Sequence, residues 1–135
     1  FEMATIFTRI IQGEIPCHKI AEDENYLAFL DIQPLVEGHV LVIPKREVDY
    51  IFDLSDDELS GLMVFSKKVA TGLKEAISCK RVGVAVIGLE VPHAHVHLVP
   101  LQTMADINFS MPKQQFAKEV MEETAAKISS RIHPS

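Results

Sequence analysis

The sequence predicts an α+β fold in which an antiparallel β-sheet of about five strands packs with a long helix, a short N-terminal helix and a C-terminal helix. The hydrophobic pattern runs in the order helix, three strands, helix, two strands, helix. This order leaves too few strand-helix-strand crossovers for a doubly wound parallel sheet. The length of 135 residues suits one domain, which we expect at residues 3–130, with a tail at 131–135.

The first half of the chain is expected to form a short helix and three strands. These elements are a helix at 5–12 and strands at 18–22, 26–31 and 38–43. Ile6 and Ile10 share one helical face, and Gly13 stops that helix. A polar cluster between the first two apolar runs indicates a β-hairpin, and Pro44 ends the third run.

The second half is expected to form a long helix, two strands and a C-terminal helix. These elements lie at 55–78, 81–87, 93–99 and 111–128. Ser55 and Glu58 form a capping box, in which each side chain can satisfy a backbone N–H at the start of the long helix. Gly61 and Gly72 lower the helix propensity of that segment without interrupting its apolar spacing.

Charge and hydropathy argue against two classes of partner. Thirteen basic against nineteen acidic residues give a formal net charge of −6, which disfavours generic binding to a nucleic-acid backbone. The most apolar stretch, at 82–101, contains Glu90, two prolines and three histidines. We therefore expect it to form buried strands rather than to enter a membrane.

The cysteines and the chain start indicate a compartment. Cys17 and Cys79 are isolated from each other, so they predict neither a disulfide framework nor a zinc knuckle. The first residues lack the pattern of a secretory signal, and we expect Met3 to be the natural start, preceded by an artificial Phe1 and Glu2. Together these features predict a reducing, cytoplasmic environment.

Three of the six histidines alternate with apolar residues late in the chain. On a strand, His93, His95 and His97 would share one face, with the residues between them facing the core. One metal ion cannot bind all three, because the outer two Cα atoms would be about 13 Å apart. Two of them could chelate a metal with a ligand from elsewhere, so a metal-binding protein is one alternative. The other is phosphoryl chemistry, with a neutral imidazole as nucleophile between imidazole donors.

The pattern at 93–99 reads His-φ-His-φ-His-φ-φ, where φ is apolar, and it resembles the signature of the histidine triad (HIT) family. Similarity to the small histidine triad nucleotide-binding branch extends to residues 6–10, 13–16, 27–34 and 38–45. The resemblance implies a HIT-like fold, a homodimer, and cleavage of nucleoside 5′-phosphoramidates or related nucleotides at the α-phosphate. The implied ligand is a purine nucleotide or nucleoside phosphoramidate, and no cofactor or metal is implied.

The resemblance also implies roles for individual residues. His95 would be the nucleophile that forms a nucleotidyl-histidine, His97 would donate to the phosphate, and His93 would orient the site. His39 would be a fourth histidine that supports His93, and Asp31 would accept hydrogen bonds from the ribose hydroxyls. The base and sugar pocket would be lined by Ile6, Phe7, Ile10, Phe29, Leu30 and Ile32.

The chain departs from the branch just before the triad. Members usually have an Asn and then Gly-Gln-Ser/Thr there, whereas this chain reads Val-Ile-Gly-Leu-Glu at 86–90. Gly88 still permits close backbone approach to an anion, but Glu90 would repel a phosphate unless it turns away. A nucleotide-binding or regulatory module with weak catalysis is therefore an alternative to a full enzyme.

Overall fold

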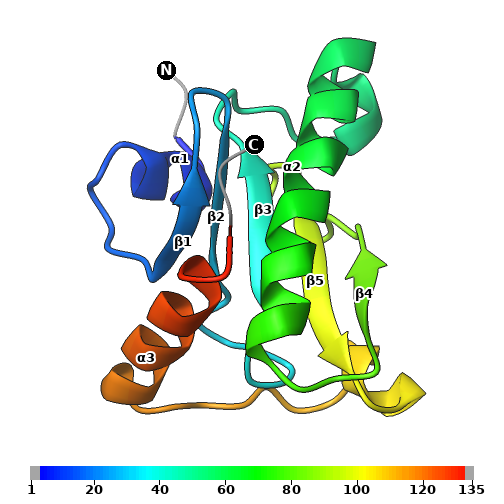
Figure 1. The fold of residues 1–135 in the computed structure, drawn as a ribbon. Helices are drawn as coiled ribbons and strands as arrows, with labels where there is room; N and C mark the ends of the chain where they lie inside the picture. The colour runs from blue at the N-terminus through cyan, green and yellow to red at the C-terminus, as the bar shows by residue number, and fades with distance from the viewer. Residues whose placement is uncertain (1–3, 133–135) are drawn as a thin grey trace.

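The computed structural model describes residues 4–132, and over this range it confirms the predicted α+β class (Figure 1). The helices are α1 (Ile6–Ile11), α2 (Asp56–Ala76) and α3 (Lys118–Ser129). The strands are β1 (Lys19–Glu22), β2 (Tyr26–Leu30), β3 (Val40–Pro44), β4 (Arg81–Ala85) and β5 (Val96–Leu101). The expected start at Met3, after Phe1 and Glu2, and the tail end at 133–135 lie outside the described residues.

The strands of the described chain form one antiparallel sheet in the order β1-β2-β3-β5-β4. β3 and β5 are neighbours near the centre, where Leu41 pairs with His97 and Val42 pairs with Val96. The segments around residues 40 and 97 are far apart in the chain, and this pairing places them side by side (Figure 1). The third triad histidine is therefore next to the strand that follows His39.

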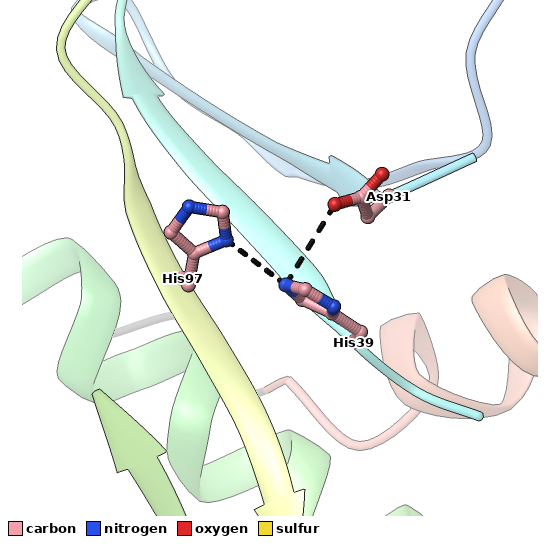
Figure 2. Close-up of side chains that lie close together, drawn as sticks. All are labelled: Asp31, His39 and His97. Carbon is pink, nitrogen blue, oxygen red and sulfur yellow. Dashed lines mark hydrogen bonds and ion pairs between the residues drawn. The ribbon is translucent and has the colours of Figure 1, made fainter. Parts of the chain in front are cut away.

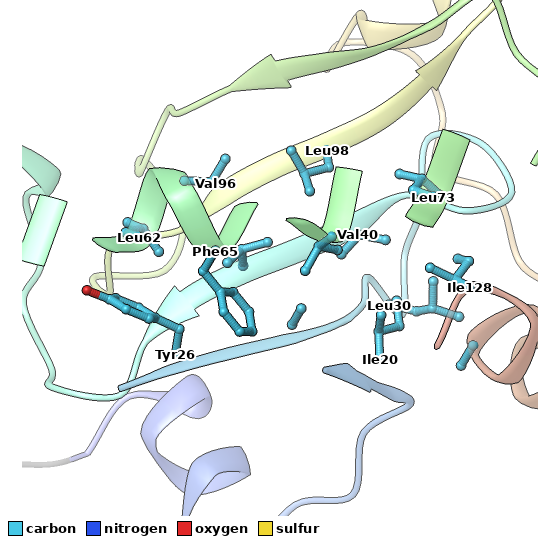
Figure 3. Close-up of a cluster of buried hydrophobic side chains, with 14 of the residues drawn as sticks. Ile20, Tyr26, Leu30, Val40, Leu62, Phe65, Leu73, Val96, Leu98 and Ile128 are labelled. Carbon is cyan, nitrogen blue, oxygen red and sulfur yellow. The ribbon is translucent and has the colours of Figure 1, made fainter. Parts of the chain in front are cut away.

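The sheet separates two hydrophobic clusters. In β3, Val40 and Val42 pack in the main core with α2 and α3, whereas Leu41 and Ile43 pack with Phe7 of α1 on the other face. Figure 3 shows much of the main core between the sheet and the helices. Its labelled members are Ile20, Tyr26, Leu30, Val40, Leu62, Phe65, Leu73, Val96, Leu98 and Ile128. The α1 face is the one on which a ligand site can form, because α2 and α3 fill the opposite face.

Helix α2 begins as the sequence predicts. The Ser55 side chain accepts a hydrogen bond from Glu58 N at 3.1 Å, and Glu58 Oε1 accepts one from Ser55 N at 3.1 Å. The helix then runs for 21 residues with one buried face. No helix within residues 4–132 has both the length and the hydropathy needed to cross a bilayer.

Two predicted starts are wrong by three or more residues, and other boundaries differ by one or two. β5 starts at Val96 rather than at residue 93, because its ladder with β3 ends at the pair Val42 and Val96 and Ala94 N instead donates to Val48 O at 2.7 Å. α3 starts at Lys118 rather than at 111, because Gln114 N instead donates to Pro34 O at 2.8 Å in an extended segment. β4 ends at Ala85 rather than at 87, and the 3-10 turns η1 (Ile51–Asp53) and η2 (Met104–Ile107) are not indicated by the sequence pattern.

Gly61 allows α2 to approach the sheet closely. A methyl group on Gly61 would overlap the Tyr26 hydroxyl and would lie 2.9 Å from Tyr26 Cζ. We expect Gly61→Ala to lower the free energy of unfolding by about 1–3 kcal/mol through overpacking, although alanine improves helix propensity by about 1 kcal/mol. Urea unfolding measures the change. The loss should shrink when Tyr26→Phe removes the hydroxyl, and a stabilised Gly61→Ala protein would contradict the prediction.

Candidate active site

A cleft of about 480 Å³ opens on the α1 face of the sheet. Its walls come from α1, the turn after β2, the loop after β4, the end of the triad and the segment after β5. The lining residues are Ile6, Phe7, Asp31, Ile32, Gln33, Leu41, Ile87, Gly88, Leu89, Glu90, Val91, His95, His97, Phe109 and Lys113. With Leu41 of β3, the cleft thus joins segments from six separate parts of the chain around two of the triad histidines.

The three triad histidines are all buried, but they have different surroundings. His95 and His97 line the cleft with ring centroids 4.9 Å apart, while His93 lies behind them and is fully buried. Only His97 is in β5, yet the apolar residues that alternate with the histidines do face the main core, as predicted. Phe7 packs edge-on against His93 and His95 at 5.7 and 5.1 Å. These contacts leave one ring edge of His95 and one of His97 for a ligand.

The hydrogen bonding of His95 leaves Nε2 available as a nucleophile. His95 Nδ1 is 2.7 Å from the backbone oxygen of His93. A carbonyl oxygen only accepts, so Nδ1 holds the proton and Nε2 keeps its lone pair. An imidazole held in this tautomer can attack an electrophilic centre in the cleft without first losing a proton.

His39 and His97 form a buried pair whose tautomers can be assigned (Figure 2). Leu35 N–H donates to His39 Nδ1 at 3.0 Å, so the proton of neutral His39 is on Nε2. His39 Nε2 then donates to His97 Nδ1 at 3.0 Å, which places the His97 proton on Nε2. His97 therefore has an N–H on the side of its ring away from His39, where it can donate to an oxyanion.

Burial keeps this pair neutral. Desolvation lowers the pKa of His39 to about 3 and the pKa of His97 to about 4. Unfolded histidine titrates near pH 6.5. Both side chains are therefore uncharged at neutral pH, and the hydrogen-bond relay from Leu35 through His39 to His97 stays intact.

The same pKa shifts predict how stability depends on pH. Between about pH 6.5 and pH 4 the unfolded chain binds more protons at these two positions, so the free energy of unfolding rises with pH across that range. Acidification from pH 7 to pH 5 should cost on the order of 1–2 kcal/mol per histidine. Urea unfolding at the two pH values should show a smaller difference for His39→Gln than for the wild type. An equal difference in both proteins would contradict the assignment.

His93 is held by residues that the sequence reasoning missed. His93 Nε2 donates to Pro44 O at 2.8 Å, so its Nδ1 accepts from Thr5 Oγ1 at 2.9 Å. Glu47 Oε1 in turn accepts from Thr5 N at 3.0 Å and from Thr8 Oγ1 at 2.6 Å. The expectation that His39 supports His93 is therefore wrong, because His39 contacts His97. Thr5 is recognisable in the sequence as a helix N-cap, but its contact with a residue 88 positions away is not.

The residues expected to bind nucleotide divide into two groups. Ile6, Phe7, Asp31, Ile32 and Gly88 line the cleft. Three others do not, which corrects the expectation that they line the pocket: Ile10 and Phe29 pack in the smaller cluster behind the cleft, and Leu30 points into the main core. Leu30 is on the wrong face because successive strand residues point to opposite sides of the sheet.

Asp31 combines a structural role with a free carboxylate oxygen. Its Oδ1 accepts a hydrogen bond from Gln33 N at 2.9 Å, which forms the turn after β2. Its Oδ2 lies 3.7 Å from His39 Nε2 and is available to a ligand in the cleft. Burial raises the pKa of the Asp31 carboxyl, and the Gln33 N–H and the Lys113 ammonium act in the opposite direction. Asp31 can therefore hold the turn with one carboxylate oxygen and contact a ligand with the other.

The loop before the triad lacks the polar side chains of the resembled branch. Gly88 has φ 74°, a conformation that glycine adopts without strain, and a Cβ there would meet no atom within 4 Å. Leu89 is 89% exposed, and Glu90 is exposed at the rim of the cleft. This loop can therefore donate hydrogen bonds to an anion through its backbone N–H groups but not through side chains.

The HIT domain family model matches residues 12–104, which is more than half of the chain. The chain belongs to the HIT family. Its sequence is 33% identical to the adenosine 5′-monophosphoramidase of Schizosaccharomyces pombe over 96% of this chain and 99% of that protein. This HIT protein is therefore similar over nearly its full length to an adenosine 5′-monophosphoramidase.

Solved structures share the fold. A HIT-like protein from Bartonella henselae superposes with a TM-score of 0.83 at 28% identity, covering 97% of this chain and 98% of that one. A zinc-bound histidine triad family protein from Mycobacterium smegmatis superposes with a TM-score of 0.83 at 26% identity, covering 96% and 94%. The α+β fold read from the sequence is thus the fold of this family.

Within residues 4–132, one group of side chains has ligand atoms close enough together to bind a metal ion. It consists of Asp31, His39 and His97 (Figure 2). A metal-bound imidazole normally donates its second ring N–H to an acceptor. In this HIT protein the second nitrogen of His39 instead accepts a hydrogen bond from Leu35 N–H. Metal binding at His39 Nε2 would place two hydrogens face to face or require an imidazolate. The donor set therefore fits a hydrogen-bonded cluster and does not fit a metal centre.

Proposed function

We propose that this HIT protein hydrolyses purine nucleoside 5′-phosphoramidates through a covalent nucleotidyl intermediate on His95. The observation that carries the proposal is the pair of complementary ring nitrogens in one cleft. His95 offers a lone pair on Nε2, and its neighbour His97 offers an N–H on Nε2. The relationship to a fungal adenosine 5′-monophosphoramidase supports the same reaction class.

The proposed reaction has two displacements at phosphorus. In the first, His95 Nε2 forms a bond to the α-phosphorus while the bond from phosphorus to the amine breaks. The amine leaves with that electron pair and takes a proton from water, and the hydroxide that remains is neutralised by the proton released in the second step. In the second, a water molecule attacks the phosphorus, the bond to His95 breaks, and the nucleoside monophosphate and a proton are released. His97 donates to a non-bridging oxygen in both steps.

Groups around His95 stabilise the positive charge that it gains in the intermediate, and Asp31 is available to the ribose. His95 becomes cationic when its Nε2 is attached to phosphorus, and the His93 carbonyl that accepts from Nδ1 stabilises this charge. Because His39 and His97 are neutral, they place no competing positive charge beside the imidazolium. Asp31, with one free oxygen at the cleft, is positioned to accept hydrogen bonds from ribose hydroxyls.

Mass spectrometry of rapidly quenched protein tests the proposal. The wild type mixed with adenosine 5′-phosphoramidate should gain one adenylyl group, located on His95 by peptide mapping. His95→Ala is the matched control and should gain none. Nucleotide binding with neither adduct nor turnover would support the regulatory-module alternative, for which Glu90 at the cleft rim is the motivating feature. Turnover without any adduct would exclude the covalent route.

We further propose that the protein is a homodimer formed through the β4 side of the sheet. β4 is an edge strand, and its side chain Val84 is 53% exposed. On α2, which packs against β4 and β5, Met63 and Val64 are also exposed. An open apolar edge promotes association. Light scattering should give twice the 15.1 kDa of one chain, and a mass of 15.1 kDa at micromolar concentration would contradict the proposal.

A further inference from the structure

Lys113 is the feature of the cleft that the proposed reaction does not use. Among the described residues that line the cleft, it is the only lysine or arginine, and it shares this lining with two carboxylates, Asp31 and Glu90. It makes no ion pair within residues 4–132. Since His39 and His97 are neutral, Lys113 is positioned to neutralise an anion in this part of the site.

The position of Lys113 is set by its surroundings. Gln114 N donates to Pro34 O at 2.8 Å, which fixes the backbone beside Lys113 against the turn that contains Asp31. Phe109 packs edge-on against His97 with centroids 4.7 Å apart, and Lys113 Nζ lies 5.1 Å from the centroid of the Phe109 ring. The cation is thereby held over an aromatic face near the triad.

Lys113 lies at the His97 end of the histidine row, away from Phe7 of α1 and within electrostatic reach of Asp31. Phe7 of α1 contacts His93 and His95, whereas Phe109 and then Lys113 follow on the side of His97. With the phosphorus at His95, an anionic group attached to it has Lys113 as the one cationic side chain among the described residues that line the cleft.

We propose that Lys113 binds a negative charge on the leaving portion of the substrate, so that this protein prefers nucleotides whose leaving group is anionic. This inference rests on the proposed function. The anion can be a further phosphate or the carboxylate of an amino acid linked through nitrogen. Both offer an oxyanion to the ammonium group, and the two are separated by the ligands used in the test.

Calorimetry with AMP and ADP tests the proposal through binding. The wild type should bind ADP more tightly than AMP, and Lys113→Gln should lower the ratio of the two affinities by about tenfold, as expected for the loss of one charge-assisted contact. Lys113→Arg should retain most of the ratio. The matched control is Lys118→Gln, which removes an exposed lysine outside the cleft and should leave the ratio unchanged. If Lys113 only neutralises Asp31, Lys113→Gln would instead lower the affinities for AMP and ADP by the same factor. That result would overturn the proposal.

Turnover provides the second arm. We compare kcat/KM for two adenosine phosphoramidates, one with an uncharged alkylamine and one with an amino acid as leaving group. The wild-type preference for the amino acid should fall in Lys113→Gln and not in Lys118→Gln. If Lys113→Gln lowers only the preference for ADP over AMP, the anion is a phosphate. If it lowers the preference for the amino acid leaving group, the anion is a carboxylate. If the wild type turns over both substrates and Lys113→Gln changes neither ratio, only this inference fails. A protein that binds no nucleotide would overturn it together with the proposed function.

Discussion

His95→Ala is expected to lower turnover of a nucleoside phosphoramidate by more than about 10³-fold, the scale seen when a covalent nucleophile is removed. The reason is specific to the site. His93 uses both ring nitrogens on Pro44 and Thr5, and His97 presents an N–H, so neither can replace the lone pair of His95 Nε2. Steady-state kinetics with a fluorogenic phosphoramidate measure the loss.

The fold of the His95→Ala protein must be verified separately. His95 is 7% exposed and lines the cleft, so its removal leaves space in the cleft and no cavity in the main core. The free energy of unfolding measured in urea should therefore change little. His18→Ala is the matched control, because His18 lies outside the lining of the cleft and should keep full turnover. A His95→Ala protein with a rate near that of the wild type would show that the nucleophile is assigned to the wrong residue.

His97→Ala should have the second largest effect, a fall in kcat of about 10²- to 10³-fold, equivalent to about 2.7–4 kcal/mol of transition-state stabilisation for one oxyanion donor. The loss should appear in kcat more than in KM, because the N–H acts on charge that develops during the reaction. Stopped assays over a range of substrate concentrations separate the two parameters.

His39 provides the control for this assignment. His39→Ala removes the group that fixes the His97 tautomer while leaving the His97 ring in place, so it should reduce kcat by a smaller factor. The double variant should be little worse than His97→Ala, because both changes act through the same N–H. Losses that add fully in the double variant would show that His39 acts independently of His97.

The sequence by itself determined the fold class, the element order and the two triad histidines that line the cleft. Local signals were sufficient where the determinants are local, as in the capping box of Ser55 and Glu58 and the apolar alternation through the triad. They failed at boundaries that depend on a distant partner. β5 starts late because the backbone of Ala94 bonds to Val48 outside the sheet, and α3 starts late because the preceding segment bonds to Pro34.

Only the tertiary structure decided which ring nitrogens of His93 and His97 hold a proton. Those assignments depend on acceptors and donors supplied by other segments: Thr5 and Pro44 for His93, and Leu35, through His39, for His97. The same holds for Lys113, which reaches the cleft through a segment that the sequence pattern assigns to a helix. A hydrogen bond between residues tens of positions apart leaves no periodic trace in the chain, because it arises from strand pairing and packing rather than from local spacing.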